Sequence, residues 1–152
     1  MRLHARIDRN APGYMHFLPP SPPSRHNPSP CRDAPDVTAE DFARRFEKLA
    51  SSGIYHIVVV EHVATSRVVA TATMLVEHKF IRNCATAGHI EDVVVDSDYR
   101  GFGLGRQVVE HLLQKGSDIG CYKVILDCGD RNVSFYEKCG MVRKGAQMGK
   151  YY

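Results

Sequence analysis

The chain has 152 residues, 43% hydrophobic and 24% charged, which is enough for one globular domain with a real core. The net charge is only +3 and no basic cluster is interleaved with aromatic residues, which argues against a nucleic-acid partner. No apolar run approaches the roughly 18 residues of a membrane span, and no apolar leader precedes the first prolines, so a cytoplasmic protein is expected.

Proline and cysteine are the two residue types with an informative distribution. All eight prolines lie in residues 12–35. This stretch is not expected to contain a regular helix, although Tyr14 to Leu18 is β-prone and favours a short strand. We therefore divide the chain into a proline-rich segment, residues 1–36, and a domain, residues 37–152. The five cysteines form no Cys-x-x-Cys pair and the eight histidines no ligand spacing, so we expect reduced thiols and no metal.

The first half of the domain predicts a helix and a hairpin. Apolar residues recur at helical spacing between an N-cap at Thr38 and a stop at Gly53. Two β-rich runs, residues 54–61 and 67–76, are separated by a short polar segment and predict paired strands. Residues 77–87 are polar and predict an extension before the next strand.

The second half begins with the most distinctive stretch of the chain. Residues 88–95 are β-branched and predict a strand, and a turn and a glycine-rich loop follow. The loop opens a segment with apolar residues at helical spacing, for which Gly116 and Gly120 are stop signals. Strand, loop and helix are therefore expected in that order.

Residues 122–127 predict a further strand, and residues 133–138 predict a short helix that Asp130 or Asn132 can cap. Residues 141–151 are polar and at best form an edge or exchanged strand. The resulting order, β-α-β-β-β-α-β-α-β, is an α/β (α+β) mixture in which a hairpin precedes a βαβ crossover.

The loop at residues 100–106 is suited to binding phosphate. The first N–H groups of a helix lack intrahelical partners and carry the positive end of the helix dipole. The loop lacks the Lys-Ser/Thr of a P-loop and comes too late for a Rossmann domain, and on spacing alone an ordinary tight turn is equally compatible. The pattern Arg/Gln-x-x-Gly-x-Gly/Ala, matched by Arg100, Gly103 and Gly105, resembles the coenzyme A pyrophosphate loop of the GNAT acetyltransferase superfamily.

That resemblance implies acetyl-coenzyme A as co-substrate and the GNAT fold, a mixed central sheet with splayed central strands flanked by helices. A second stretch, residues 132–140, resembles the signature in which an asparagine and a helix tyrosine stand beside the sulfur. Tyr136 would then be the acid for the leaving thiolate, and the amide of Val94 a candidate oxyanion donor. The residues implied at the coenzyme are Val93, Val94, Val95, Arg100, Gly101, Phe102, Gly103, Leu104, Gly105, Arg106, Asp127, Asn132 and Tyr136.

Two longer runs, residues 88–93 and 120–128, resemble the glucosamine 6-phosphate N-acetyltransferase family. The resemblance implies acetyl transfer to the amine of D-glucosamine 6-phosphate in a ternary complex, as in UDP-GlcNAc biosynthesis. Glu91 and Asp127 would be carboxylates near the amine, and Tyr122 with Lys123 would serve the partner's site across a homodimer interface. The implied substrate-binding residues are Lys79, Phe80, Ile81, Arg82, Glu91, Asp92, Val93, Tyr122 and Lys123.

Two alternatives use the same residues. A polyamine or protein N-acetyltransferase would share the fold, but a polyamine site should lack paired basic residues such as Lys79 and Arg82. A non-catalytic acetyl-coenzyme A binding module would not need Tyr136. The family's common arginine near the C-terminus is not obvious here, and Lys150 or Arg143 is a candidate to take its place.

Overall fold

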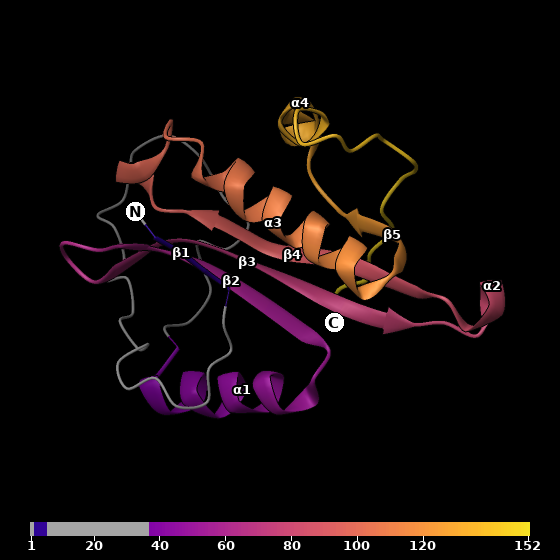
Figure 1. The fold of residues 1–152 in the computed structure, drawn as a ribbon, viewed down its shortest axis with the longest axis horizontal. Coiled ribbons are helices and arrows are strands. Elements are labelled where there is room, and N and C mark those ends of the chain that lie inside the picture. The colour runs from indigo at the N-terminus through magenta and orange to yellow at the C-terminus, as the bar shows by residue number, and fades with distance from the viewer. Residues whose placement is uncertain (1, 6–36) are drawn as a thin grey trace.

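The computed structural model describes residues 2–5 and 37–152, in which a five-stranded sheet has helices on both sides (Figure 1). The strands lie side by side in chain order: β1 (Arg2–Ala5), β2 (Tyr55–His62), β3 (Arg67–His78), β4 (Thr86–Val95) and β5 (Cys121–Leu126). Neighbours from β1 to β4 are antiparallel, whereas β5 is parallel to β4. The predicted mixed sheet is confirmed.

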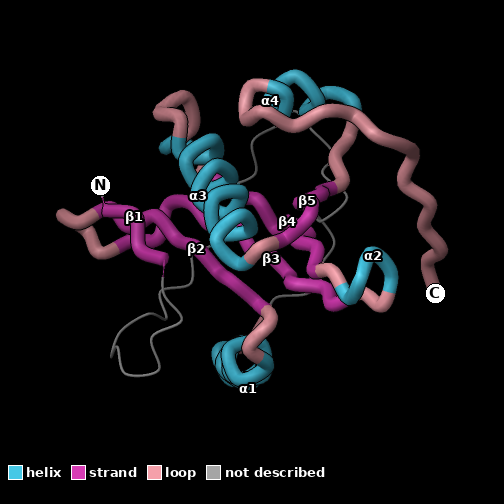
Figure 2. Tube along the Cα trace, turned by 45° about the vertical axis from the view of Figure 1, so that its right-hand side comes forward, coloured by secondary structure: helices cyan, strands magenta, loops and turns pink. Residues whose placement is uncertain are grey.

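The helices differ greatly in how they contact the sheet. They are α1 (Ala39–Ser52), α2 (Ile81–Cys84), α3 (Leu104–Ile119) and α4 (Val133–Glu137). Helix α3 contacts β2, β3, β4 and β5, while α1 contacts chiefly β2. Figures 1 and 2 draw α3 and α1 on opposite sides of the sheet. No helix in the described part of the chain is long and apolar enough to cross a membrane.

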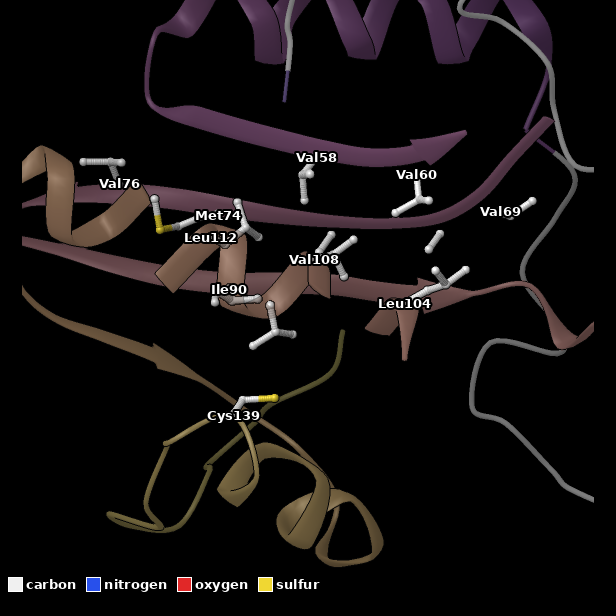
Figure 3. Packing of buried hydrophobic residues seen from close by; sticks show 13 residues of the cluster. Val58, Val60, Val69, Met74, Val76, Ile90, Leu104, Val108, Leu112 and Cys139 are labelled. Atoms are coloured by element: carbon white, nitrogen blue, oxygen red, sulfur yellow. The ribbon is translucent and has the colours of Figure 1, made fainter. Parts of the chain in front are cut away.

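The core lies between α3 and the sheet. Alternate residues of the strands point toward α3, as expected for a sheet with one covered face. Figure 3 shows this cluster, whose most completely buried large side chains are Met74, Ile90, Leu112, Val58, Val60, Val69, Val108 and Val109. Each such side chain contributes about 1.5–3 kcal/mol by leaving water, so α3 is the element that fixes the position of β4.

Two glycines let α3 and the strands approach closely. A Cβ at Gly116 would lie 2.5 Å from Val124 Cγ2, and a Cβ at Gly88 would lie 2.8 Å from Met74 Sδ. Gly116 is therefore a packing residue inside α3, and its interpretation as a stop signal was wrong. The helix ends instead at Gly120, whose φ of 82° is the left-handed conformation of a C-cap.

Helix α1 has the ends that the sequence predicts. The Thr38 side chain accepts the N–H of Asp41 at 3.1 Å, and Gly53 is the C-cap with a φ of 74°. Its apolar residues include the stacked pair Phe42 and Phe46, with ring centroids 6.1 Å apart, but none of its residues is fully buried.

The segment predicted as a polar extension is a hairpin. β3 runs on to His78 and β4 begins at Thr86, and the short α2 between them is a left-handed turn. Arg82, Asn83 and Cys84 all have φ between 53° and 59°. A left-handed residue other than glycine costs roughly 1–2 kcal/mol, so this turn is strained.

The two ends of the chain differ most from expectation. A first strand from the N-terminal segment was suggested at residues 14–18, which lie outside the described residues, whereas the sheet has its first strand, β1, at residues 2–5. The short helix α4 is confirmed, but its N-cap Asn132 makes no side-chain capping bond. Residues 141–152 form no strand in this chain, and Figure 2 draws them as a loop leading to the C-terminus.

Candidate active site

The sheet opens beside the middle of β4. The last residue pair between β4 and β5 is Ile90 with Leu126, so β4 continues from Glu91 to Val95 without β5 beside it. On the other edge, β4 stays paired with β3 but contains a bulge, in which Asp92 and Val93 oppose Ala72 alone. Asp92 has a φ of 53°. Bulges bend a strand and increase its twist, which is a physical reason for β4 to diverge from β5 here.

The register determines which amides face the opening. The N–H of Asp96 donates to the carbonyl of Val69 at 2.9 Å, and successive N–H groups of a strand alternate in direction. Val94, two residues back and opposite Thr71, therefore directs its N–H toward β3. The expectation that Val94 supplies an oxyanion donor is corrected by this register, and Val93, within the bulge, is the better candidate.

A buried carboxylate holds the turn after β4. The Asp96 side chain is only 4% exposed and accepts hydrogen bonds from Arg67 Nη2 at 3.2 Å and from the N–H of Asp98 at 3.0 Å. The turn continues as a short 3-10 helix, Ser97–Tyr99. Asp96 thus ties the β2–β3 hairpin to the chain just before the glycine-rich loop.

The glycine-rich loop leaves the first turn of α3 open to an anion. Gly101 and Gly103 have φ of 84° and 75°, and a Cβ at either would meet nothing within 4 Å. The N-cap Gly103 makes no side-chain capping bond, and no acidic residue lies in the first helical turn. Gly105 instead allows α3 to pack closely against α4, since a Cβ added at Gly105 would lie 3.3 Å from the ring of Phe135. The backbone of the loop therefore has room for an anion, and phosphate binding at this loop stays a prediction.

Four other loop residues show how the segment is held. The Leu104 side chain is buried in the core, so only its backbone is available to a ligand, whereas Phe102 is 65% exposed. Arg100 Nε donates to the carbonyl of Val95 at 3.4 Å, and Arg106 Nε donates to Glu110 at 2.6 Å. Both guanidinium groups therefore have partners within the loop and helix.

Tyr136 on α4 is half-buried against the core and packs edge-on to Phe135, with ring centroids 4.9 Å apart. Burial, with the nearby thiols of Cys128 and Cys139, raises the pKa of Tyr136 above 10.0. The phenol therefore stays protonated at neutral pH and can donate a hydrogen bond. Asn132, the N-cap of the same helix, is exposed.

Two carboxylates predicted at the amine meet at one histidine. His89 Nε2 lies 3.2 Å from Glu91 Oε1 and 3.5 Å from Asp127 Oδ2. Glu91 follows His89 by two residues on β4, and Asp127 follows the end of β5. The structure thus brings Glu91 and Asp127 together at the edge of the opening. His89 was missed from sequence, although its i, i+2 spacing with Glu91 on a strand places both on one face.

The predicted phosphate-binding residues gather around Tyr122. The Arg82 guanidinium carbon lies 5.1 Å, and Lys123 Nζ 5.6 Å, from the centre of the Tyr122 ring. Lys79 pairs instead with Glu77, and this hydrogen bond, with the charges of Lys79, His89 and Lys123, lowers the pKa of Glu77. Of the three predicted cations, Arg82 and Lys123 are therefore the two without an ion-pair partner among the described residues.

The remaining predicted residues lie at exposed points. Phe80 and Ile81, at the tip of the β3–β4 hairpin, are 97% and 65% exposed. Arg143 pairs with Asp130 at 3.1 Å, and Lys150 lies over the ring of Tyr152. Neither Arg143 nor Lys150 therefore joins the cluster around Tyr122.

Comparison with known proteins gives a consistent result. Residues 20–141 match the family model described as the acetyltransferase (GNAT) family. The chain is 53% identical over 117 residues to a protein of Arabidopsis thaliana named glucosamine 6-phosphate N-acetyltransferase, covering 76% of this chain and 78% of that protein. It is 46% identical over 149 residues to glucosamine 6-phosphate N-acetyltransferase 1 of Oryza sativa subsp. japonica, covering 97% and 82%.

Solved structures agree with the sequence matches. The crystal structure of glucosamine-6-phosphate N-acetyltransferase from Arabidopsis thaliana has a TM-score of 0.75 at 52% identity, covering 77% of this chain and 80% of that chain. An acetyltransferase from Trypanosoma brucei has a TM-score of 0.73 at 36% identity, covering 79% and 84%.

Proposed function

Because the chain belongs to the GNAT acetyltransferase family, and within it to the glucosamine 6-phosphate N-acetyltransferases, we propose that it transfers the acetyl group of acetyl-coenzyme A to the amine of D-glucosamine 6-phosphate. Its products are N-acetyl-D-glucosamine 6-phosphate and coenzyme A. The amine attacks directly while both substrates are bound.

The observation that supports this proposal most directly is the opening between β4 and β5 next to the uncapped N-terminus of α3. The extended pantetheine arm of coenzyme A can lie along β4 from Glu91 to Val95 only because β5 is not paired with β4 there. A pyrophosphate attached to that arm would reach the N–H groups of Leu104 and Gly105, which have no competing cap. The available backbone groups thus fit coenzyme A.

When bound, acetyl-coenzyme A supplies a thioester as the acyl donor. We assign the N–H of Val93 to the carbonyl oxygen, where negative charge develops as the amine attacks. Tyr136, whose raised pKa keeps its hydroxyl protonated, donates to the departing sulfur. Glu91 and Asp127, or a water held by them, accept the proton that the substrate ammonium loses.

The basic cluster around Tyr122 supports a phosphate on the substrate. Arg82 and Lys123 both lie over this ring and form no ion pair with an acid among the described residues, so their charges are available. A phosphate monoester carries between one and two negative charges near neutral pH, and each such cation offers it charge-assisted hydrogen bonds. A plain amino sugar or a polyamine gains nothing from this cluster.

The active enzyme is proposed to be a homodimer with its sites at the interface. β5 is the last strand of the sheet and pairs only with β4 among the described strands. The segment after α4 exposes Val142, Met148 and Tyr151 and pairs with no strand of its own chain. An unpaired edge and an unpaired segment in one chain favour an exchange between two copies, which would bring Tyr122 and Lys123 close to the neighbouring site.

A turnover assay separates this function from its alternatives. Thiol release from acetyl-coenzyme A should be fast with glucosamine 6-phosphate and slow with glucosamine, a polyamine and a lysine peptide. Faster turnover of the polyamine or peptide would assign a different amine. Coenzyme binding by calorimetry without turnover of any amine would indicate a binding module.

Mixed dimers test the shared site. Lys123→Ala should weaken the apparent affinity for the sugar phosphate by roughly ten- to a hundred-fold, since one charge-assisted contact contributes about 1.5–3 kcal/mol. If Lys123 serves its partner, mixing Lys123→Ala subunits with Tyr136→Phe subunits should restore one working site per mixed dimer. No recovery in dimers verified by mass would place each site within one chain.

We also propose that the enzyme acts in the cytoplasm on the route to UDP-GlcNAc. The cysteines in the described residues, Cys84, Cys121, Cys128 and Cys139, are all free thiols, as is usual in a reducing compartment. Fluorescence microscopy of the tagged full chain tests the location.

A further inference from the structure

His89 occupies a position that the reaction outlined above does not use. Its side chain is 19% exposed and points to the face of the sheet opposite α3, since its neighbour Ile90 is in the core. Leu75 of β3 and Ile125 of β5 are its register partners on either side. An apolar side chain of similar size would therefore suit the packing at this position.

The ring nitrogen that faces the site is fully buried and needs a partner. Nε2 has no hydrogen bond of good geometry among the described residues, yet it lies 3.2 Å from Glu91 and 3.5 Å from Asp127. A buried, unsatisfied polar nitrogen costs about 1–3 kcal/mol. Such an atom between two carboxylates is best satisfied by sharing a proton with both.

The charges around His89 restrict what this nitrogen can do. Glu91 lies on β4, the same strand as His89, and Asp127 follows β5. Glu77 on β3 interacts electrostatically with His89 and also with Lys123 on β5. Two carboxylates that converge repel each other unless a donor lies between them. His89 Nε2 lies within 3.5 Å of both carboxylates, so the imidazole is placed to be that donor.

We propose that His89 is a positioning residue whose Nε2–H is shared between Glu91 and Asp127 and holds both carboxylates at the substrate amine. The inference rests on the proposed function, in which these carboxylates accept the ammonium proton. It requires the tautomer with the proton on Nε2, because an unprotonated Nε2 would repel both oxygens. Glu91 lies on β4 and Asp127 directly follows β5, so His89 also links the two strands at the point where their pairing ends.

Two substitutions distinguish positioning from packing. His89→Leu keeps an apolar side chain between Leu75 and Ile125 but removes the donor, whereas His89→Gln keeps an N–H donor at the end of the side chain. Positioning predicts that kcat falls about ten- to a hundred-fold in His89→Leu, as expected for misplacement by roughly 1 Å, and returns to within a few-fold in His89→Gln. The KM for acetyl-coenzyme A should be unchanged in both.

A packing role predicts the reverse order, with His89→Leu active and His89→Gln impaired, and that order would overturn the proposal. The matched control is His111→Gln on α3, which lines a separate groove between α1, β2 and α3 and should retain full activity.

Nuclear magnetic resonance tests the contact without any assay of activity. Nitrogen-15 shifts of the ring report which nitrogen carries the proton. In the wild type at neutral pH this should be Nε2, and the Glu91→Gln/Asp127→Asn double variant should shift the Nε2 signal. A proton on Nδ1 alone, or an Nε2 signal insensitive to the double variant, would refute the contact. Correct ring signals in an enzyme inactive on glucosamine 6-phosphate would instead remove the proposed function and leave the contact standing.

Discussion

Replacing Gly116 by alanine tests whether the contact between α3 and β5 sets the position of that strand. The added Cβ would lie 2.5 Å from Val124 Cγ2, about 1 Å inside the optimal carbon–carbon separation of roughly 3.5–4.0 Å. Val124 is β-branched and has little rotamer freedom with which to move away. The helix and the strand must therefore separate.

The expected loss of stability is the difference between two opposing effects. Overpacking a well-packed core costs about 1–3 kcal/mol, while alanine in place of glycine within a helix gains roughly 1 kcal/mol. The net destabilisation should then be at most about 2 kcal/mol. For a domain of this size, that lowers Tm by up to roughly 8 °C.

Urea denaturation followed by circular dichroism measures this difference. Val124→Ala in the Gly116→Ala background removes the clashing methyl groups and should recover part of the loss, which a double-mutant cycle would report as a favourable coupling. Gly129→Ala is the matched control, because its φ is −68° and its Cβ would meet nothing within 4 Å. A Gly116→Ala protein more stable than the wild type by about 1 kcal/mol, the full gain in helix propensity, would refute the close contact.

Three further predictions concern the site. Tyr136→Phe should lower kcat about ten- to a thousand-fold, or roughly 1.4–4 kcal/mol. Because burial raises the pKa of Tyr136 from its ordinary value, the wild-type kcat should show no alkaline loss from this group near neutral pH, and a Tyr136-dependent limb near neutrality would contradict the assignment. Gly103→Val forces a β-branched residue to a φ of 75°, so calorimetry should show much weaker coenzyme A binding in a folded protein, and unchanged affinity would remove the loop from the site. Burial raises the pKa of the Cys139 thiol, so iodoacetamide at neutral pH should label exposed Cys84 well before Cys139, as peptide mass spectrometry can check.

The features predicted correctly from sequence are those with local causes. Thr38 and Gly53 fix the ends of α1 because capping depends on a few neighbouring residues. The loop before α3 is recognisable because glycine is needed where φ is positive, as at Gly101 and Gly103.

The features that were missed depend on contacts between distant segments. Gly116 resembles a helix stop until Val124 is known to pack against it. The direction of the Val94 amide follows from the pairing of Thr71 with β4, and the meeting of His89 with Asp127 follows from the parallel register of β5. The left-handed turn at Arg82 to Cys84 contains no glycine, so no local signal marks it.

The early end of pairing between β4 and β5 also links the stability of the fold to its ligand. Past Ile90 and Leu126 the sheet has a second edge, where backbone groups of β4 remain without β5 as a partner. On the proposed function, the arm of the coenzyme occupies the place of the missing strand. A ligand bound only by the folded state, at about 100 times its Kd, adds about 2.7 kcal/mol to the free energy of unfolding. The resistance of this enzyme to unfolding and proteolysis should therefore rise and fall with the concentration of acetyl-coenzyme A, even when no amine is present.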